Sequence, residues 1–421
     1  MTGRQRWREV KIGELGRVVT GKTPPSARPE LFGEVHPFIT PTDIDGVSRE
    51  VTTGRFVSDE GAAAFKNQMI PAGAVCFVCI GATIGKMCVA ARRSLTNQQV
   101  NSIIVDEDVH DPRFVFYVLR QLAPDVRGLA GGAATPIISK SGFSDIGIKV
   151  PGLDYQRRIA SILSAYDDLI ENNTRRIAIL EEMARRIYEE WFVRYRFPGH
   201  EGVRMVESEL GSVPEGWSPS RLALVCARMN SGNTPSRSNP GYWAGGSVDW
   251  YKTKELWDEY LFESEERVSD LAVRENKTRV FEPGTILMAI YGSPTVGRLG
   301  ITTRRAACNQ AALGMRPDTS KIFFWTLYYT LFALRAEFNN KAQGAAQQNI
   351  SKEKVAEALF VLPPMEVQSK FDESVGPIQA MLCNLQERNR NLRTTRDLLL
   401  PKLISGELDV SALPEPEALA A

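Results

Sequence analysis

The sequence predicts an α+β protein made of two tandem α/β domains, each followed by a long α-helix, with the two helices pairing as an antiparallel coiled coil. Three observations predict this fold class. The chain repeats itself at an offset of 212 residues, each copy opens with short apolar runs between glycines and prolines, and each copy closes with a stretch of helical period. The two halves are therefore expected to be related by a pseudo-two-fold internal repeat.

The internal repeat is visible in three pairs of segments at the same offset. "NQQVNSIIVDEDV" from Asn97 corresponds to "NQAALGMRPDTS" from Asn309, and "GGAATPIISKSGF" from Gly131 corresponds to "QGAAQQNISKEKV" from Gln343. "VPGLDYQ" from Val150 corresponds to "LPPMEVQ". Because repeats at a fixed period mark repeated structural units, we expect two copies of one structure over most of the chain.

The first part of each copy is predicted to be the α/β domain. Apolar runs with strand character, bounded by turn residues, lie at 35–40, 74–81, 85–90 and 100–105 in the first copy and at 247–253, 285–292 and 297–303 in the second. One helix is expected after Asp111 and one after Thr319. The apolar run Ile322–Leu334 is too short to span a bilayer and is predicted to be a buried helix.

The second part of each copy is predicted to be a long helix. Asp154–Phe197 contains no glycine or proline, and only Gly376–Pro377 interrupts Glu366–Leu400. Apolar residues step alternately by four and three through both segments, as in heptad seams. A helix packed only on its own domain would show a similar stripe, but two matching seams favour mutual pairing. The predicted domains are 1–152 and 198–364, the helices 153–197 and 365–408, and a flexible tail 409–421.

An antiparallel register follows from the polar interruptions of the two seams. Asn173 and Asn389 are set opposite each other because a buried amide facing an apolar layer is costly. The other layers then pair apolar residues, among them Trp191 with Phe371. The exception is Tyr166 with Arg396, whose charge is expected at the rim. We predict that Asn173 and Asn389 bond to each other and fix the register.

Composition sets broad limits on function. The 421 residues are 43% hydrophobic with a net charge of +1, which is ordinary for a soluble protein and gives no overall attraction to nucleic acid. The beginning of the chain lacks the apolar core of a signal peptide, so a cytoplasmic location is expected. The six cysteines are then expected to be reduced.

The cysteine and histidine pattern predicts no metal site and no catalytic site. Cys76 and Cys79 form a C-x-x-C, but they lie in an apolar run without a second ligand pair nearby, so core packing is the better interpretation. His36, His110 and His200 are scattered. No nucleophile stands beside a base in the sequence.

One short motif suggests an ATPase. "GRVVTGKT", Gly16–Thr23, matches the phosphate-loop pattern, but the chain continues into prolines at 24, 25 and 29, which disfavour the helix that must follow. Its counterpart in the second copy, Ala227–Thr234, keeps only the "G-x-T-P" turn and has Asn233 in place of the lysine. The match is therefore interpreted as accidental, and an ATP-binding enzyme using Lys22 stays an alternative.

Two unequal domains at a fixed separation suit an elongated ligand with two sites, such as duplex DNA. Basic and amide residues in the glycine-rich loops are the candidate DNA contacts, although a solvated surface role is open for each. In the first copy they are Lys22, Thr23, Lys86, Arg92, Arg93, Asn97, Gln98 and Lys140; in the second they are Asn233, Thr234, Lys252, Lys254, Arg298, Arg304, Arg305, Asn309, Gln347, Asn349 and Lys352. The Asn-Gln pairs have an alternative role in satisfying backbone groups where a strand begins.

The chain resembles the specificity subunits of type I restriction-modification enzymes over nearly its whole length. The resemblance rests on "PIISKSGFSDIGIKVPGLDYQ", "NISKEKVAEALFVLPPMEVQ", "ESELGSVPEGW" and the tail "LLLPKLISGELDV", together with their order and duplication. It departs at Asp154–Tyr155, where the second copy has Met365–Glu366. That difference affects a local helix cap.

The resemblance implies a function for each part. Each α/β domain would be a target-recognition domain that reads one half of a bipartite DNA site, asymmetric because the copies differ. The helices would set the spacing and bind two methyltransferase subunits, with restriction subunits joining. The chain itself would be non-catalytic, and S-adenosylmethionine, ATP and Mg would be bound by the partner subunits. An alternative is a coiled-coil adaptor that does not bind DNA.

Overall fold

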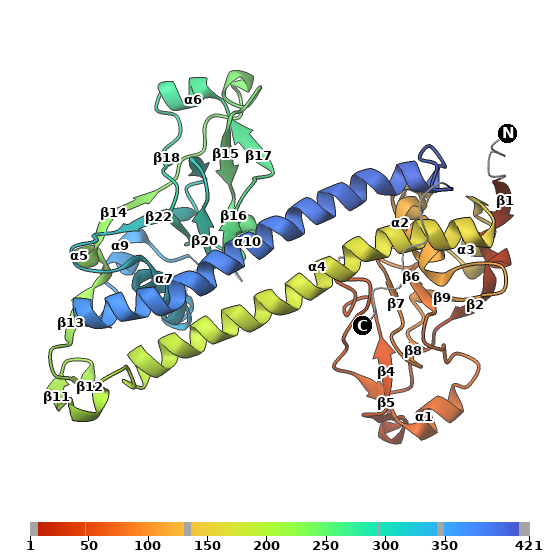
Figure 1. Cartoon of the computed structure of the whole chain (residues 1–421), viewed down its shortest axis with the longest axis horizontal. Coiled ribbons are helices and arrows are strands. Elements are labelled where there is room, and N and C mark those ends of the chain that lie inside the picture. The colour runs from red at the N-terminus through yellow and green to blue at the C-terminus, as the bar shows by residue number, and fades with distance from the viewer. Residues whose placement is uncertain (1–6, 47, 130–135, 293–294, 343–348, 412–421) are drawn as a thin grey trace. The chain divides into compact units, whose positions relative to one another are not determined.

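The computed structural model describes residues 7–46, 48–129, 136–292, 295–342 and 349–411 (Figure 1). The chain divides into two compact units. Unit 1 comprises Met1–Asn172 and Asn389–Ala421, and unit 2 comprises Asn173–Arg388. The boundary therefore falls inside both long helices, and each unit is described by itself.

The central sheet of unit 1 is antiparallel. Its strands follow the order β2 (Gly16–Thr20), β9 (Val100–Val105), β6 (Val75–Val78) and β7 (Met87–Val89). The strands predicted at 74–81, 85–90 and 100–105 are confirmed. Cys76 and Cys79 are buried, with 0% and 2% of their surface exposed, which confirms their predicted place in the core.

A second, smaller sheet and several short elements complete the first α/β domain. The sheet has the order β3 (Phe32–Gly33), β5 (Phe56–Val57), β4 (His36–Ile39) and β8 (Leu95–Thr96). The helices are α1 (Asp59–Ala64), α2 (Pro112–Leu129) and α3 (Lys140–Ser144), with single turns at Ile12–Glu14 and Pro29–Leu31. β1 (Arg8–Lys11) pairs with β10 (Gly147–Val150), so the two ends of this domain lie together.

Unit 2 repeats this plan with additions. Its central sheet runs β14 (Cys226–Ser231), β22 (Ala312–Pro317), β19 (Ile286–Ala289), β20 (Leu299–Thr302) and the extra edge strand β16 (Glu259–Leu261). The second sheet runs β17 (Glu266–Val268), β15 (Val248–Tyr251), β21 (Ala306–Cys308) and β18 (Val280–Phe281). β13 (Ser218–Arg221) pairs with β23 (Leu359–Leu362), as β1 does with β10.

The remaining elements of unit 2 are short, apart from the helix that packs on the central sheet. They are β11 (Met205–Ser208), β12 (Gly211–Pro214), α5 (Leu222–Val225), α6 (Asp270–Arg274), α7 (Phe324–Ala333), α8 (Arg335–Ala342) and α9 (Lys352–Ala356), with single turns at His200–Gly202, Pro240–Tyr242 and Thr253–Glu255. The buried helix predicted at Ile322–Leu334 is confirmed as α7. Its equivalent in unit 1 is α2.

Two long helices follow the domains. α4 covers Leu153–Tyr188 and passes into a π-helical turn at Glu189–Val193, and α10 covers Met365–Ile404. α10 continues through Gly376 and Pro377, so this break in the sequence pattern does not end the helix. Each helix buries apolar side chains in the core of the unit that contains them, for example Leu163 in unit 1 and Phe371 in unit 2.

In unit 1 the two helix segments run antiparallel. Arg158 donates to the carbonyl of Ser411 at 3.1 Å, Asp167 pairs with Arg396, and Asn389 Nδ2 lies 3.3 Å from the carbonyl of Ile170. Along these contacts the residue numbers rise in the α4 segment and fall in the segment that contains the end of α10. In unit 2 the rings of Trp191 and Phe371, a predicted layer, lie 5.9 Å apart.

The proposed bond between Asn173 and Asn389 joins residues of different units and stays a prediction. The expectation that Arg396 carries its charge at the rim is wrong. Only 2% of Arg396 is exposed, and its guanidinium pairs with the carboxylate of Asp167. The seam pattern placed the residue in the correct helix face but gave no sign that a carboxylate from the facing helix would accompany it.

A buried glutamine joins each domain to its long helix in the same way. Gln156 donates to Pro151 O at 2.9 Å and accepts from the backbone N–H of Asp111 at 3.1 Å. Gln368 donates to Pro363 O at 2.8 Å and accepts from the N–H of Phe323 at 2.9 Å. Both glutamines are fully buried. The amide thus ties the beginning of the long helix to the beginning of α2 or α7.

Candidate functional site

Three loops meet at one edge of each central sheet. β2 ends, β9 begins and β6 ends at the same edge, because neighbouring strands are antiparallel. In unit 2 the ends of β14 and β19 and the beginning of β22 share an edge in the same way. Most of the candidate residues from the sequence lie in or beside these loops.

The "G-x-T-P" loop lies directly against the Asn-Gln turn. Gly21 N–H donates to Val100 O at 3.1 Å and Lys22 N–H donates to Thr96 O at 2.8 Å. A Cβ on Gly21 would overlap the carbonyl oxygens of Thr96 and Asn97, and a Cβ on Gly232 would overlap that of Cys308. Glycine is therefore required by the close approach of two backbones.

Each of these loops is closed by a hydrogen bond between a threonine and a glutamine. Thr23 Oγ1 donates to Gln98 Oε1 at 2.5 Å, and Thr234 Oγ1 donates to Gln310 Oε1 at 2.5 Å. All four residues are exposed. Equivalent residues, 211 apart for the threonines and 212 for the glutamines, thus form the same contact twice, and we call these contacts the Thr–Gln pairs.

Asn97 and Asn309 connect the Asn-Gln turn to the strand of the second sheet through backbone hydrogen bonds. Asn97 N–H donates to Ile39 O at 3.2 Å, and Asn309 N–H donates to Tyr251 O at 3.0 Å. Asn97 Oδ1 also accepts from Gln99 N–H at 3.1 Å. The expectation that Asn97 satisfies backbone groups where a strand begins is confirmed.

The third loop brings in the segment after α2 or α8. Ile138 N–H donates to Cys79 O at 2.9 Å, and Ile350 N–H donates to Ile290 O at 2.9 Å. Lys140 and Lys352 follow as the first residues of α3 and α9. Asn349 Oδ1 accepts from Gly292 N–H at 3.3 Å. Gln347 lies outside the described residues.

Four candidate arginines lie away from this edge. Arg92 and Arg93 lie in the turn after β7, which runs antiparallel to β6 and therefore ends at the opposite edge of the sheet. Arg304 and Arg305 occupy the equivalent turn after β20. The structure does not bring these arginines together with the Thr–Gln pairs.

Four candidate cations of the second domain lie within ion-pair distance of carboxylates. Lys252 pairs with Glu266, Lys254 Nζ lies 2.6 Å from Glu265 Oε2, and Arg304 pairs with the buried Asp249. The hydrogen bond from Lys254 lowers the pKa of the Glu265 carboxyl. Arg305 Nε lies 4.0 Å from Glu282 Oε1, at the limit of an ion pair.

Candidate cations of the first domain have different neighbours. In the described part of the chain no carboxylate lies within ion-pair distance of Lys22, Arg92, Arg93 or Lys140. Lys22 Nζ lies 5.8 Å from the centre of the Phe65 ring. Lys86 Nζ donates to Ile44 O at 2.7 Å, whereas its counterpart Arg298 lies 4.0 Å above the Trp257 ring. Cations over ring faces stay available to anions.

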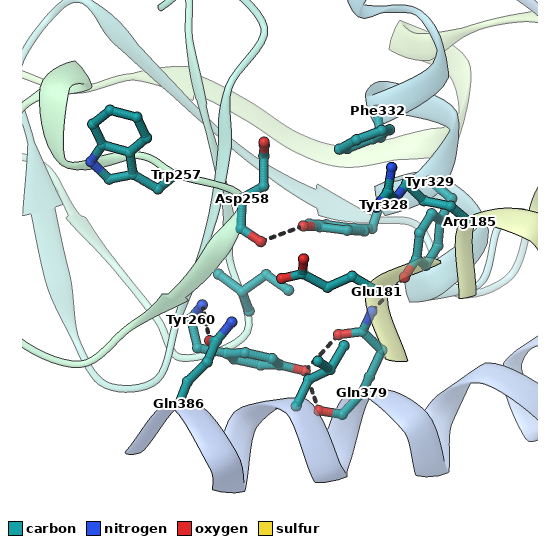
Figure 2. A pocket seen from close by; sticks show the side chains of 12 residues that line it. Glu181, Arg185, Trp257, Asp258, Tyr260, Tyr328, Tyr329, Phe332, Gln379 and Gln386 are labelled. Carbon is teal, nitrogen blue, oxygen red and sulfur yellow. Dashed lines mark hydrogen bonds between the residues drawn. The ribbon is translucent and has the colours of Figure 1, made fainter. Parts of the chain in front are cut away.

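Sequence reasoning missed a contact between each domain and its long helix. Tyr117 on α2 donates to Asp167 Oδ2 at 2.5 Å, and at the equivalent place in unit 2 Gln379 donates to Tyr329 OH at 2.6 Å. Figure 2 shows Gln379 between Tyr329 and Tyr260 at the wall of a cavity of 240 Å³. The two contacts occupy equivalent positions of the repeat, since Tyr117 and Tyr329, and also Asp167 and Gln379, are 212 residues apart.

Arg237 is a second residue that the candidate set lacked. Its guanidinium lies 3.6 Å from the centre of the Trp243 ring and pairs with Glu266 at 2.5 Å. Lys252 and then Arg237 lower the pKa of the Glu266 carboxyl. Arg237 corresponds to Ser26 in the first copy, where the equivalent turns are Pro29–Leu31 and Pro240–Tyr242, so the repeat gave no signal for a cation at this position.

The structure gives no support to a phosphate loop. Gly16–Thr20 is strand β2, and the described chain after Lys22 continues as a loop to the single turn Pro29–Leu31, so the required helix does not follow. Among the described residues no group of three or more His, Cys, Asp or Glu side chains could hold a metal ion. Nor does any helix in the described ranges have the length and apolarity to cross a bilayer.

Comparison with known proteins identifies the family. The profile described as "Type I restriction modification DNA specificity domain" matches residues 4–182 and 214–373. The MjaIX specificity subunit of Methanocaldococcus jannaschii is 26% identical over 97% of this chain and 94% of its own length. The HindI specificity subunit of Haemophilus influenzae is 33% identical over 39% of this chain and 38% of its own.

A solved structure shows the same fold. The S subunit of a type I restriction-modification system from M. genitalium superposes with a TM-score of 0.62 at 15% identity, covering 96% of this chain and 97% of that one. The matched profile covers both copies and both long helices begin within it. The chain therefore belongs to the family of type I restriction-modification specificity subunits, with two DNA specificity domains.

Proposed function

We propose that this chain recognises an asymmetric DNA target in two parts, with one half contacted by each α/β domain. The observation that supports this most is the repeated loop edge. The backbone bonds from the loop glycines, Gly21 and Gly232, and the Thr–Gln pairs recur in both copies, while neighbouring exposed side chains differ, as Lys22 differs from Asn233. Equal frameworks with unequal contact groups suit two different half-sites.

The proposed contacts divide into two kinds. Basic residues such as Lys22 and Arg92 would neutralise phosphates, and side chains near the sheet edge that differ between the two copies would contact base edges. The net charge of +1 means that affinity depends on these local groups. The chain itself would carry out no catalysis, and the methyltransferase and restriction subunits would supply S-adenosylmethionine, ATP and Mg.

Exposed apolar side chains on the long helices support a partner surface. In unit 2 Ile179 and Met183 lie one turn apart on α4 and are 61% and 47% exposed. In unit 1 Leu169 and Leu398 are 55% and 65% exposed. Large apolar side chains exposed on a helix face are suited to packing against helices of another protein. We assign these faces to two methyltransferase subunits, with restriction subunits joining the complex.

The test is co-expression with the methyltransferase subunits, followed by mapping of methylated bases across a genome. A motif of two unlike parts with a fixed spacer is expected. A palindromic motif would contradict the asymmetry, and binding that needs only one half-site would contradict the two-part target. I179E with M183E should reduce co-purification of the methyltransferase without changing the fold measured by circular dichroism.

An ATPase assay distinguishes the proposed function from the alternative of an ATP-binding enzyme that uses Lys22. The purified chain is expected to hydrolyse ATP no faster than buffer, and Lys22→Ala is expected to change DNA affinity alone. ATP hydrolysis that Lys22→Ala abolishes would support the enzyme alternative instead. An adaptor that does not bind DNA would show no discrimination between a duplex carrying the mapped motif and an unrelated duplex.

A further inference from the structure

The Thr–Gln pairs are the exposed side-chain contact that both copies share at the loop edge. Thr23 and Gln98 in the first domain, and Thr234 and Gln310 in the second, form the same bond at 2.5 Å. The residues around them differ, since Lys22 is replaced by Asn233 and Gln99 by Ala311. A feature held constant while its surroundings change is suited to a part of the ligand that is constant as well.

The geometry leaves a defined donor group on each glutamine. The threonine hydroxyl donates to Oε1, so the amide is oriented with its NH₂ group away from the threonine. No acceptor for Nε2 of Gln98 or Gln310 exists among the residues that the structure describes. Both side chains are exposed. Each pair therefore presents an oriented N–H donor to solvent at the edge of its domain.

Because the two half-sites differ in base sequence, what they share is the sugar-phosphate backbone. Glutamine and threonine side chains are common phosphate contacts, which fix position without reading sequence. We propose that Gln98 and Gln310, each oriented by its threonine, donate to a DNA phosphate at equivalent places in the two half-sites. This inference rests on the proposed function, and it assigns a positioning role that is independent of base readout.

The test uses the complex with methyltransferase subunits and two duplexes, one with the mapped motif and one unrelated. Gln98→Ala and Gln310→Ala are each expected to weaken binding to both duplexes by about tenfold, since a hydrogen bond to a charged group is lost. The methylated motif should stay unchanged. Thr23→Val should act like Gln98→Ala, and Thr23→Ser should restore binding because it keeps the hydroxyl.

The controls separate this role from others. Gln121→Ala, at an exposed glutamine on α2, should leave both affinities unchanged. The slope of affinity against salt should be the same in Gln98→Ala as in the wild type, since a neutral donor displaces no counterion, whereas Lys22→Ala should lower the slope by about one.

Three results would overturn the proposal. Unchanged affinity in Gln98→Ala with a lower unfolding temperature would show that the pair only closes the loop. A changed half-site in the methylation motif would show a base contact. Unchanged affinity with unchanged stability would show no role. If the wild-type complex fails to distinguish the two duplexes, the proposed function itself is wrong, which is a separate outcome.

Discussion

The two α/β domains share a backbone framework, but several of their candidate cations have different partners. In the second domain the candidate cations Lys252, Lys254 and Arg304 are each held by a carboxylate, whereas in the first Lys22 and Arg92 lie against aromatic rings. The contacts that repeat are made by backbone groups and by a few amide and hydroxyl side chains. The backbone framework is therefore kept in both domains while the exposed charged side chains around it differ.

Where each domain meets its long helix, it is unit 1 that has the ion pair and unit 2 that has a neutral contact. In unit 1 the buried Asp167 bonds Tyr117 and pairs with Arg396, and burial, followed by the Asp167 charge, raises the pKa of the Tyr117 hydroxyl. In unit 2 the equivalent positions are Gln379, Tyr329 and Ala184, so the contact is neutral. A neutral amide suffices there because no guanidinium is buried opposite it.

Removing the buried carboxylate of Asp167 is expected to have the largest effect on stability. Asp167→Ala leaves the Arg396 guanidinium buried without the carboxylate of the facing helix, and should lower the free energy of unfolding of unit 1 by about 3–5 kcal/mol. Gln379→Ala should cost unit 2 only about 1–2 kcal/mol. Hydrogen exchange in α2 and α7 peptides measures each unit separately. Asp167→Leu with Arg396→Met should recover most of the loss, and equal costs in the two units would contradict the argument.

Removing the buried glutamine that joins the domain to its long helix should lower stability equally in the two units. Gln156→Ala and Gln368→Ala each leave a backbone carbonyl and N–H buried without a partner, which should cost about 2–4 kcal/mol in either unit. Denaturant unfolding followed by hydrogen exchange gives the two values. The exposed Gln121→Ala serves as the control with little expected change. A cost in one unit alone would show that the two joints are not equivalent.

A third change tests the shared loop edge. Gly21→Ala and Gly232→Ala place a Cβ against backbone carbonyls, and each should lower the stability of its own domain by about 1–3 kcal/mol. Gly54→Ala, whose added Cβ would meet nothing within 4 Å, is the matched control. Thermal unfolding and DNA binding should both respond to the first two variants, and neither should respond to the control.

The smallest expected effect is on the salt dependence of DNA affinity, and it tests whether paired and unpaired lysines contribute differently. Lys22→Ala should lower the slope of log affinity against log salt by about one, while Lys252→Ala should change it less, because its ammonium is already paired with Glu266. Glu266→Gln removes one of the two carboxylates near Lys252, the other being Glu265 at 3.7 Å from Nζ, and should raise DNA affinity. Filter or fluorescence titrations at several salt concentrations measure this. Equal slopes for both lysine variants would show that the ion pair opens on binding without cost.

The sequence predicted the parts of this structure that repeat or have a strong period. The strands β6, β7, β9, β15, β19 and β20, the helix α7 and the two long helices follow from apolar runs and the offset of 212 residues. Gln156 and Gln368 end a pair of matching segments, but the repeat did not predict the bonds that they make. Arg396 was misplaced because a heptad pattern gives the layer of a residue and not its polar partner.

The contact surface was less predictable. The carboxylate that holds Lys252 is Glu266 on β17, and the two side chains meet only because β15 and β17 pair. The turn containing Arg92 and Arg93 looks equivalent to the other basic loops in sequence, yet strand direction places it at the opposite edge of the sheet. Such facts depend on pairings between distant segments, which residue types alone do not specify.

The glutamine joints have a consequence for how such a protein can change over generations. Gln156 bonds the carbonyl of Pro151 and the N–H of Asp111, and Gln368 bonds the carbonyl of Pro363 and the N–H of Phe323. One further contact is to a side chain, since Gln156 Nε2 lies 3.3 Å from His110 Nδ1. Because the bonds to the carbonyls and N–H groups do not depend on residue type, a genetic crossover near either glutamine codon would keep these main-chain bonds of the joint. If each domain contacts one half-site as proposed, a single recombination event would then exchange one half-site and leave the other unchanged.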